Sequence, residues 1–423
     1  MKRLCLVLLA VLMLFSAACT AIDTENSSDS VESVESVESV ESAEITLSSE
    51  SSDDDFVEAS SAESPETSIE ASSEDVSSEE EVSESSSEEI SESSENESAS
   101  SATSSVDSES SEEGAESDTL SGTIPTRVFE SNGVLISGIR GMEKYGGSVE
   151  SGTNFSKMVG DFKDDLGDDI QVYTIVAPHA SCYYAPESYA KLIERGEINF
   201  SNLKEKSDPD VHYIDVYNKL WQHIDEDIYP RTEHHWNALA AYYAAEEFAK
   251  EAGVNFPSLD NYEKLEMEGF VGSLYNFSGS SVLKKYPETL VAYKPKLSYN
   301  ASFYYSDNYN LDKPNYRRDS VVFNVRSYPG AFLGGDSISV KIETENTTGR
   351  KLVIFKDSYG NCFVPFTVFS FDEVYVLDIR YYKRNGISFC ESVGATDVAF
   401  VLSGFTATGS VYKNIDKIRK YSN

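Results

Sequence analysis

The sequence predicts an α/β protein, with helices packed against a mainly parallel β-sheet, preceded by a long segment without a core. Two observations predict this organisation. After residue 122, short apolar runs typical of buried strands alternate with segments of helical spacing, and such alternation favours a parallel sheet. Before residue 122, serine and acidic residues dominate, so the chain there lacks the apolar surface that a core requires.

Each predicted strand is a short apolar run, and the clearest is 172–177, which is continuous and closed by Pro178. The strongest predicted helix is 237–251, because it is rich in alanine and is followed by Gly253, a typical helix stop. The strand candidates are 134–136, 172–177, 213–216, 352–355, 374–377 and 398–402. The helix candidates are 154–166, 186–195, a segment through Trp221, 237–251, 360–369 and 386–393.

The segment 262–345 interrupts this alternation. It is rich in Tyr, Asn and Ser and contains only short β-like runs, such as 320–323. We predict a β-rich insertion over the sheet of a domain that spans 123–423; a small second domain is the alternative.

The net charge of −39 belongs chiefly to the segment before this domain. Residues 21–120 contain 33 acidic residues, 35 serines and no Lys or Arg, whereas 121–423 contain 32 basic and 40 acidic residues, a net charge of −8. A charge of −39 excludes a nucleic-acid binder. We predict that 19–122 is a disordered tether, extended by the repulsion of its like charges.

The N-terminus has the pattern of a bacterial lipoprotein signal peptide. A short basic region precedes an apolar run, 4–15, and small residues precede Cys19. A run of about a dozen residues is too short to span a bilayer of roughly 30 Å. We predict a signal peptide over 1–18 and a lipid anchor on Cys19, which would hold the protein at the extracellular face of the membrane; secretion with nearby cleavage is the alternative.

Three cysteines fall within the predicted domain, Cys182, Cys362 and Cys390. An odd number allows at most one disulfide within the domain. Without a CxxC spacing, burial as small apolar side chains is the simpler interpretation.

The first candidate functional segment is 231–237, Arg-Thr-Glu-His-His-Trp-Asn, directly before the alanine-rich helix. In an extended segment side chains alternate, so Glu233 and His235 should point to one side and His234 to the other. A carboxylate so placed can orient an imidazole and stabilise its protonated form, which is the role of the acid in a nucleophilic triad. The helix N-terminus disfavours a second proton on His235, so we predict a neutral base.

The second candidate segment is 354–361, Ile-Phe-Lys-Asp-Ser-Tyr-Gly-Asn, where an apolar strand stops and a helix is predicted to begin. Such a turn exposes a side chain at the carboxyl edge of a sheet and directs backbone N–H groups at an anion formed there. Ser358 is therefore the candidate nucleophile, and an N-cap role is the alternative. Its own N–H is the first candidate for an oxyanion donor, and the Asn361 side chain is a second.

These segments resemble a known family. The run 231–236 resembles the signature of the DHHW proteins of Gram-positive bacteria, and the Asp-x-His-Trp element that they share with the alginate acetylation proteins. The further resemblances, in the family's order, are Gly-Ser-Leu-Tyr at 272–275, Phe-Lys-Asp-Ser-Tyr at 355–359 and Asp-Ile-Arg-Tyr-Tyr at 378–382. The resemblance covers most of 127–420 and implies an SGNH-hydrolase-like fold, a three-layer α/β sandwich.

The same resemblance implies an activity. The alginate relatives transfer or remove acetyl groups on exopolysaccharide through a Ser-His-Asp triad. Matched by position, this implies Ser358 as nucleophile, His235 as base and Glu233 as orienting acid. It further implies an O-acetyltransferase or acetylesterase that acts on a cell-surface polysaccharide with an acyl donor and no cofactor. Because Glu233 stands where the family has Asp, a non-catalytic polysaccharide-binding or cell-wall assembly protein is the alternative.

Two further hypotheses concern neighbouring residues. A zinc site could combine the Glu233, His234 and His235 cluster with His212 or His223, but adjacent histidines point apart on a strand and no HExxH spacing supports it. We predict no metal. Arg380 follows a predicted strand, where it could contact substrate or form an ion pair with Asp378.

Overall fold

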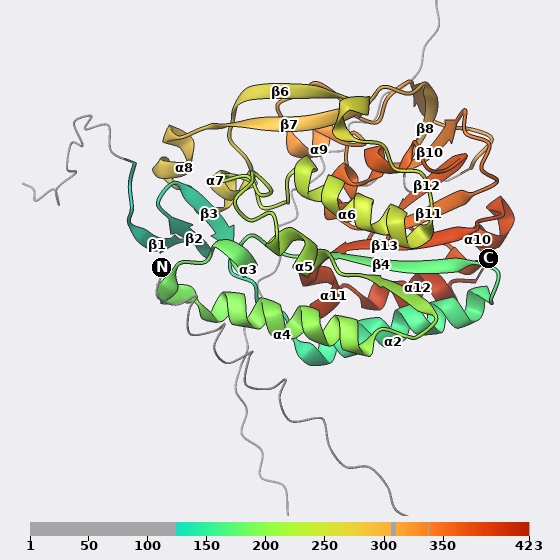
Figure 1. The fold of residues 1–423 in the computed structure, drawn as a ribbon, viewed down its shortest axis with the longest axis horizontal. Helices are drawn as coiled ribbons and strands as arrows, with labels where there is room; N and C mark the ends of the chain where they lie inside the picture. The colour runs from blue at the N-terminus through green and yellow to red at the C-terminus, as the bar shows by residue number, and fades with distance from the viewer. Residues whose placement is uncertain (1–123, 306–309, 337, 423) are drawn as a thin grey trace, which may run out of the picture. The chain divides into compact units, whose positions relative to one another are not determined.

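A computed structural model describes residues 124–305, 310–336 and 338–422 (Figure 1). The predicted signal peptide, Cys19 and the whole of the predicted tether lie outside the described residues. Within these ranges, no helix combines the length and the apolarity needed to cross a membrane.

The central sheet has eight strands. In spatial order these are β5 (Val211–Ile214), β4 (Gln171–Ala177), β13 (Asp397–Ser403), β11 (Lys351–Lys356), β12 (Glu373–Asp378), β10 (Ile338–Thr344), β8 (Tyr299–Tyr305) and β9 (Tyr316–Arg318). The strands from β5 to β12 pair in parallel, and β10, β8 and β9 continue the sheet with antiparallel pairs. The parallel strands therefore end at one edge, which we call the carboxyl edge.

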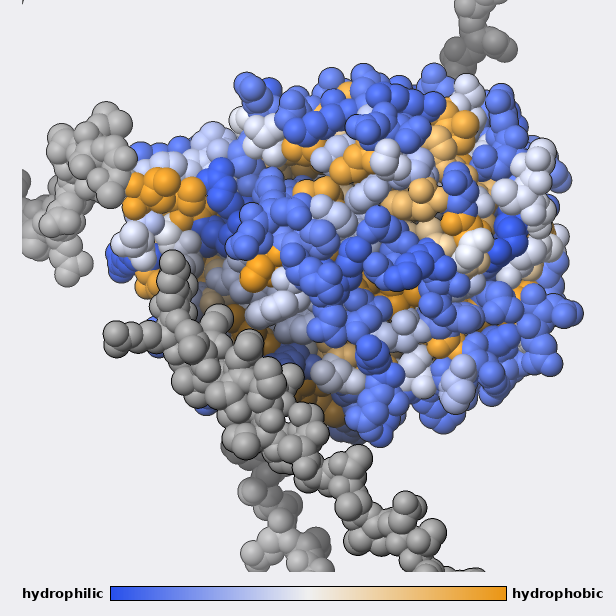
Figure 2. All heavy atoms as spheres, in the orientation of Figure 1, coloured by the Kyte–Doolittle hydropathy of each residue, from blue (hydrophilic) through white to orange (hydrophobic). Residues whose placement is uncertain are grey.

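Helices lie on both faces of this sheet. One face carries α2 (Val149–Leu166), α4 (Lys191–Lys206) and α12 (Lys413–Lys420), and the other carries α6 (Ala238–Ala252) with α5 (Val216–Trp221) beside it (Figure 1). Because both faces are covered, β13 is buried along its whole length. The viewed surface is mainly hydrophilic, with apolar side chains in small patches (Figure 2).

The remaining elements are short. Two further sheets are present: one of β1 (Val128–Ser131), β2 (Val134–Ser137) and β3 (Arg140–Glu143), and one of the antiparallel pair β6 (Tyr262–Phe270) and β7 (Glu288–Pro295). The other α-helices are α3 (Ser181–Tyr184), α7 (Ser273–Ser278), α8 (Ser281–Lys285), α9 (Tyr328–Ala331), α10 (Gly386–Val393) and α11 (Gly404–Thr408). The 3-10 helices are η1 (Glu187–Tyr189), η2 (Leu259–Asn261), η3 (Ser358–Cys362) and η4 (Val364–Thr367).

The predicted α/β class is confirmed, but the sheet is mixed rather than mainly parallel in its full extent. The difference arises from the segment 262–345, which was expected to lie over the sheet. Only its β6–β7 pair forms a separate sheet, whereas β8, β9 and β10 add three strands to the central one. Strand pairing between distant segments leaves no mark on local periodicity, so the sequence did not reveal this extension.

Two predicted helices differ from those observed. The helix predicted at 186–195 begins at Lys191 and continues to Lys206, because its buried residues recur at helical spacing up to Leu203. The helix predicted at 360–369 is two 3-10 turns. Pro365 stands at the start of the second, where its missing N–H and rigid ring oppose a continuous helix through 360–369.

The three cysteines within the described ranges, Cys182, Cys362 and Cys390, are buried and form no disulfide with one another. Burial raises the pKa of the Cys362 thiol to about 12. These side chains therefore act as small apolar groups of the core.

Candidate functional site

Ser358 lies at the carboxyl edge, in the turn that directly follows β11. The preceding Asp357 is buried and fixes this turn: its Oδ1 accepts a hydrogen bond from Tyr359 N at 2.9 Å, and its Oδ2 accepts from Ser403 N at 2.8 Å and Thr406 Oγ1 at 2.7 Å. Gly360 is required for the tight path, since a Cβ there would lie 2.5 Å from the Lys356 Cβ.

Ser358 itself is half-buried and is the first residue of η3. The first N–H groups of a helix have no acceptor within the helix. The Ser358 backbone N–H is therefore available to a ligand, as the sequence predicts for an oxyanion donor. The N-cap role falls to Asp357 rather than to Ser358.

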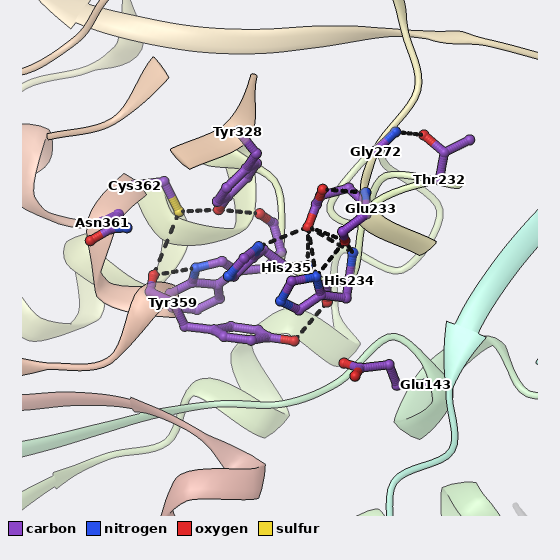
Figure 3. A network of polar contacts seen from close by, with 12 residues as sticks. Glu143, Thr232, Glu233, His234, His235, Gly272, Tyr328, Tyr359, Asn361 and Cys362 are labelled. Carbon is purple, nitrogen blue, oxygen red and sulfur yellow. Dashed lines mark hydrogen bonds and ion pairs between the residues drawn. The ribbon is translucent and has the colours of Figure 1, made fainter. Parts of the chain in front are cut away.

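Glu233 and His235 form a buried pair opposite this turn (Figure 3). His235 Nδ1 lies 2.8 Å from Glu233 Oε1, so the ring donates its Nδ1 proton to the carboxylate. The Nε2 atom is then the basic nitrogen. It is buried and has no hydrogen-bond partner among the described residues. The longer Glu233 side chain thus reaches the histidine at ordinary hydrogen-bond distance.

His234 differs from its predicted orientation. The segment 231–237 is a bent loop rather than an extended strand, so the two histidine rings lie side by side, 3.7 Å apart. His234 Nδ1 lies 2.9 Å from Glu233 Oε1, the same oxygen that His235 contacts. One carboxylate therefore faces both histidines.

Backbone and hydroxyl groups of the next segment hold Glu233 in place. Its Oε2 accepts a hydrogen bond from Ser273 N at 2.9 Å, and its Oε1 accepts one from Ser273 Oγ at 2.8 Å. Gly272 permits this approach, because a Cβ there would lie 2.6 Å from the Glu233 Cβ. The Gly-Ser pair was recognised in the sequence as part of the family pattern, but its supporting role was not.

These contacts set the ionisation of the three groups. Burial alone would raise the pKa of Glu233, but hydrogen bonds from His234 and His235 hold it well below its ordinary value. Burial lowers the pKa of His235, and the charge of His234 lowers it further, against the opposing effect of Glu233. For His234, the hydrogen bond to Glu233 outweighs burial and raises the pKa. His235 is therefore the histidine of this pair that favours the neutral form, as the sequence predicts.

Tyr359 connects the turn 357–360, which we call the serine turn, to the loop 231–237, which we call the histidine loop. Trp236 Nε1 donates to Tyr359 O at 2.8 Å, and Tyr359 Oη donates to His234 O at 2.6 Å. The Tyr359 ring lies 4.9 Å from the His235 ring (Figure 3). No hydrogen bond joins Ser358 Oγ to His235 within the described ranges. The structure therefore brings the serine turn and the histidine loop together without a direct contact between the predicted nucleophile and base.

Two further side chains position this site and were missed in the sequence. Tyr328 stacks on His235 with an interplanar angle of 1° and a centroid distance of 4.5 Å, which fixes the ring plane. His179 accepts a hydrogen bond from Phe405 N at its Nε2, so its Nδ1 donates to Tyr359 Oη at 2.9 Å. Neither residue lies in a recognisable motif, so only the fold reveals these roles.

Both candidate substrate residues, Asn361 and Arg380, contact the carboxylate of Asp336. Asn361 Nδ2 donates to Asp336 Oδ1 at 2.6 Å, while its buried Oδ1 has no partner among the described residues. Arg380 forms ion pairs with Asp378 at 2.7 Å and with Asp336 at 3.3 Å. The ion-pair interpretation of Arg380 is therefore correct, and one amide N–H of Asn361 is already in use.

The additional ligands that the zinc hypothesis needed lie elsewhere. His212 contacts Glu251 at 2.8 Å, and His223 contacts Glu226 at 2.6 Å. Glu233, His234 and His235 do place three potential ligand atoms within 4.8 Å of one another. His235 Nδ1, however, already donates to the Glu233 carboxylate, and His234 Nδ1 is engaged by Ser273 Oγ and by the same carboxylate.

A family model and several solved structures match this chain. The family model for DHHW proteins matches residues 55–377. The structure of a DHHW family protein from Eubacterium siraeum is 35% identical, covers 71% of this chain and 100% of that chain, and has a TM-score of 0.65. Two structures of Bacillus cereus PatB1, one with a sulfonyl adduct, are each 18% identical, cover 68% of this chain and 97% and 98% of theirs, and have TM-scores of 0.51. Among curated proteins, none matches significantly.

The fold and the site define a class: α/β proteins that bring a buried carboxylate–histidine pair to a serine turn at the carboxyl edge of the sheet. This chain belongs to the DHHW family. The resemblance to DHHW proteins predicted from the sequence is thereby confirmed, and the family match begins at residue 55, within the predicted tether, rather than at 127.

Proposed function

We propose that the protein is an acyl-ester enzyme of SGNH-hydrolase-like, three-layer fold, an O-acetyltransferase or acetylesterase acting on a cell-surface polysaccharide. The proposal rests on the geometry of His235. Its Nδ1 is held by Glu233, while its buried Nε2 has no hydrogen-bond partner among the described residues. A neutral imidazole so oriented is the base that a serine nucleophile needs.

The proposed reaction has two acyl-transfer steps. In the first, Ser358 Oγ attacks the acyl carbonyl carbon and its proton passes to His235 Nε2. The tetrahedral anion is stabilised by the Ser358 N–H. His235 returns the proton to the departing alcohol, which leaves an ester on Ser358. In the second, a sugar hydroxyl or water attacks this ester by the same route, and Ser358 recovers its proton.

Modification of the serine tests this proposal. PatB1, which shares the fold, has been solved with a sulfonyl adduct, so a sulfonyl fluoride is a suitable probe. We expect one equivalent of probe on Ser358, detected by peptide mass spectrometry, and loss of both labelling and p-nitrophenyl acetate hydrolysis in Ser358→Ala. Ser410→Ala, an exposed serine outside the site, should behave as wild type. Equal labelling and turnover in Ser358→Ala would contradict the proposal and favour a polysaccharide-binding role.

We also propose that the enzyme works at the extracellular face of a Gram-positive membrane, anchored by two acyl chains on Cys19. The tether 19–122 would hold the domain away from the membrane, since its acidic residues are repelled by anionic lipid and wall polymers. Replacing Cys19 by alanine should move the protein from the membrane fraction to the medium, as measured by immunoblotting. Unchanged retention in the membrane fraction would exclude a lipid anchor at this position.

A further inference from the structure

A groove beside the edge strand β5 is lined by one face of α4 and by α5. Its volume is about 680 Å³, within the range of ligand sites. The α4 residues that line it recur at helical spacing, from Ile193 through Glu197 to Glu205. The α5 wall is made of Tyr217, Asn218 and Trp221.

The α5 wall carries an exposed aromatic platform. Trp221 is 44% exposed, although it is one of the largest apolar side chains. Its ring is supported from behind by the buried rings of Tyr183 and Tyr217, at centroid distances of 5.8 and 6.4 Å. An amphipathic ring held rigidly in this way offers contact area to a ligand at little cost in conformational entropy.

Polar groups of the groove are free to bind a ligand. The side chains of Glu197 and Ser201 are exposed and make no hydrogen bond to any described residue. Lys204 is neutralised by Asp215 at 2.8 Å. Glu205 is paired with Lys206 at 2.8 Å, so Glu197 is the lining carboxylate without an ionic partner among the described residues. This leaves a small excess of negative charge, which disfavours polyanions and suits neutral or amino-bearing ligands.

The groove is connected to the candidate catalytic site through packed rings. Phe200, in the groove wall, lies 6.1 Å from Tyr145, which stacks on His179 at 5.5 Å. His179 in turn contacts Tyr359, next to Ser358.

We propose that this groove is a glycan-binding subsite for a neutral or amino-bearing segment of polysaccharide, with Trp221 stacking on the apolar face of a sugar ring. The inference rests on the proposed function for its choice of ligand. The binding itself does not require turnover.

Fluorescence offers a direct test, because the chain has only two tryptophans, the exposed Trp221 and the fully buried Trp236. Titration of the full-length protein with chitohexaose should produce a saturable change in emission that disappears in Trp221→Phe. An equal change in Trp221→Phe would place the sugar near Trp236 instead and overturn the proposal. Oligogalacturonate, a polyanion, should produce no saturable change; binding as tight as that of chitohexaose would contradict the charge argument.

Calorimetry supplies the matched variants. Trp221→Ala should weaken chitohexaose binding at least tenfold, and Ser201→Gln, which fills the groove but leaves Trp221, should do the same. Tyr305→Ala removes an exposed ring from β8, toward the opposite edge of the sheet from β5, and should bind as wild type. Wild-type affinity in both groove variants would overturn the proposal. Binding that depends on Trp221, together with failure of Ser358 labelling, would retain the subsite and reject the proposed reaction.

Discussion

Replacing His235 by glutamine should lower kcat for p-nitrophenyl acetate hydrolysis by at least about 10⁴-fold, the scale of loss when a triad base is removed. Glutamine is close in size and can still donate to Glu233, so the buried loop should remain folded. It has no basic nitrogen at the position of Nε2. Stopped-flow or steady-state kinetics with a circular dichroism melt would separate lost chemistry from lost structure.

His212→Gln is the matched control, because His212 also pairs with a glutamate, at the far end of β5 from the serine turn. It should retain wild-type turnover. If His235→Gln hydrolysed the ester at more than a tenth of the wild-type rate with Ser358 still essential, His235 would not be the base.

The pH dependence follows from the same contacts. The base must be neutral, and burial together with the His234 charge holds the pKa of His235 below its ordinary value. The logarithm of kcat/KM should therefore stay level at pH 6.5 and fall only as the pH drops through this lowered value. In His234→Gln the neighbouring charge is absent, while Glu233, Glu143 and Asp336 still face the site. The acid limb should then move to higher pH; an unmoved limb would contradict this coupling.

The sequence predicted those parts of the fold that depend on local pattern. Continuous apolar runs indicated β4, β11, β12 and β13, and the alanine-rich segment ending at Gly253 indicated α6. The position of Ser358 at the carboxyl edge could also be predicted, because the apolar run of β11 ends just before it. By contrast, the pairing of β10 with β12 joins residues 30 to 36 positions apart, and no local signal specifies which strands will pair.

The candidate site shows the same division between local and distant information. Glu233 and His235 are two residues apart, and their contact was predicted correctly, although from an extended segment that the structure does not have. The prediction for His234 was wrong because it assumed an extended segment, whereas Gly141 N binds Arg231 O and Thr232 binds Glu288, which bends the loop. These anchors come from β3 and β7, and their positions depend on tertiary packing.

A buried ion pair at the end of β11 should contribute strongly to the stability of the domain. Lys356 follows the last core residues of β11 and is fully buried, with its Nζ 2.9 Å from Asp378 Oδ2. Asp378 is 2% exposed and also accepts hydrogen bonds from Arg380 Nε and Nη2. Removing one partner of a buried pair leaves the other charge uncompensated in the interior. Asp378→Asn should therefore lower the free energy of unfolding by about 3–5 kcal/mol, as measured by urea denaturation.

The double variant Lys356→Met with Asp378→Asn separates the lost attraction from the stranded charge. It removes the buried ammonium, and Arg380 keeps Asp336 as a partner, so most of the lost stability should return. Glu266→Gln breaks an exposed pair with Lys264 and should change the unfolding free energy by less than about 1 kcal/mol. A double variant no more stable than Asp378→Asn would show that the loss does not come from the stranded Lys356 charge.

Acid titration gives an independent check on this pair. Burial alone would raise the pKa of Asp378, but Lys356 and Arg380 lower it below its ordinary value. The ionised carboxylate therefore contributes stability above its unfolded pKa of about 3.9, and this contribution is lost as the pH falls through the lower folded value. The stability difference between wild type and Asp378→Asn should shrink below pH 4. A difference that stayed constant down to pH 2 would mean that Asp378 stabilises the carboxyl edge through its shape rather than through its charge.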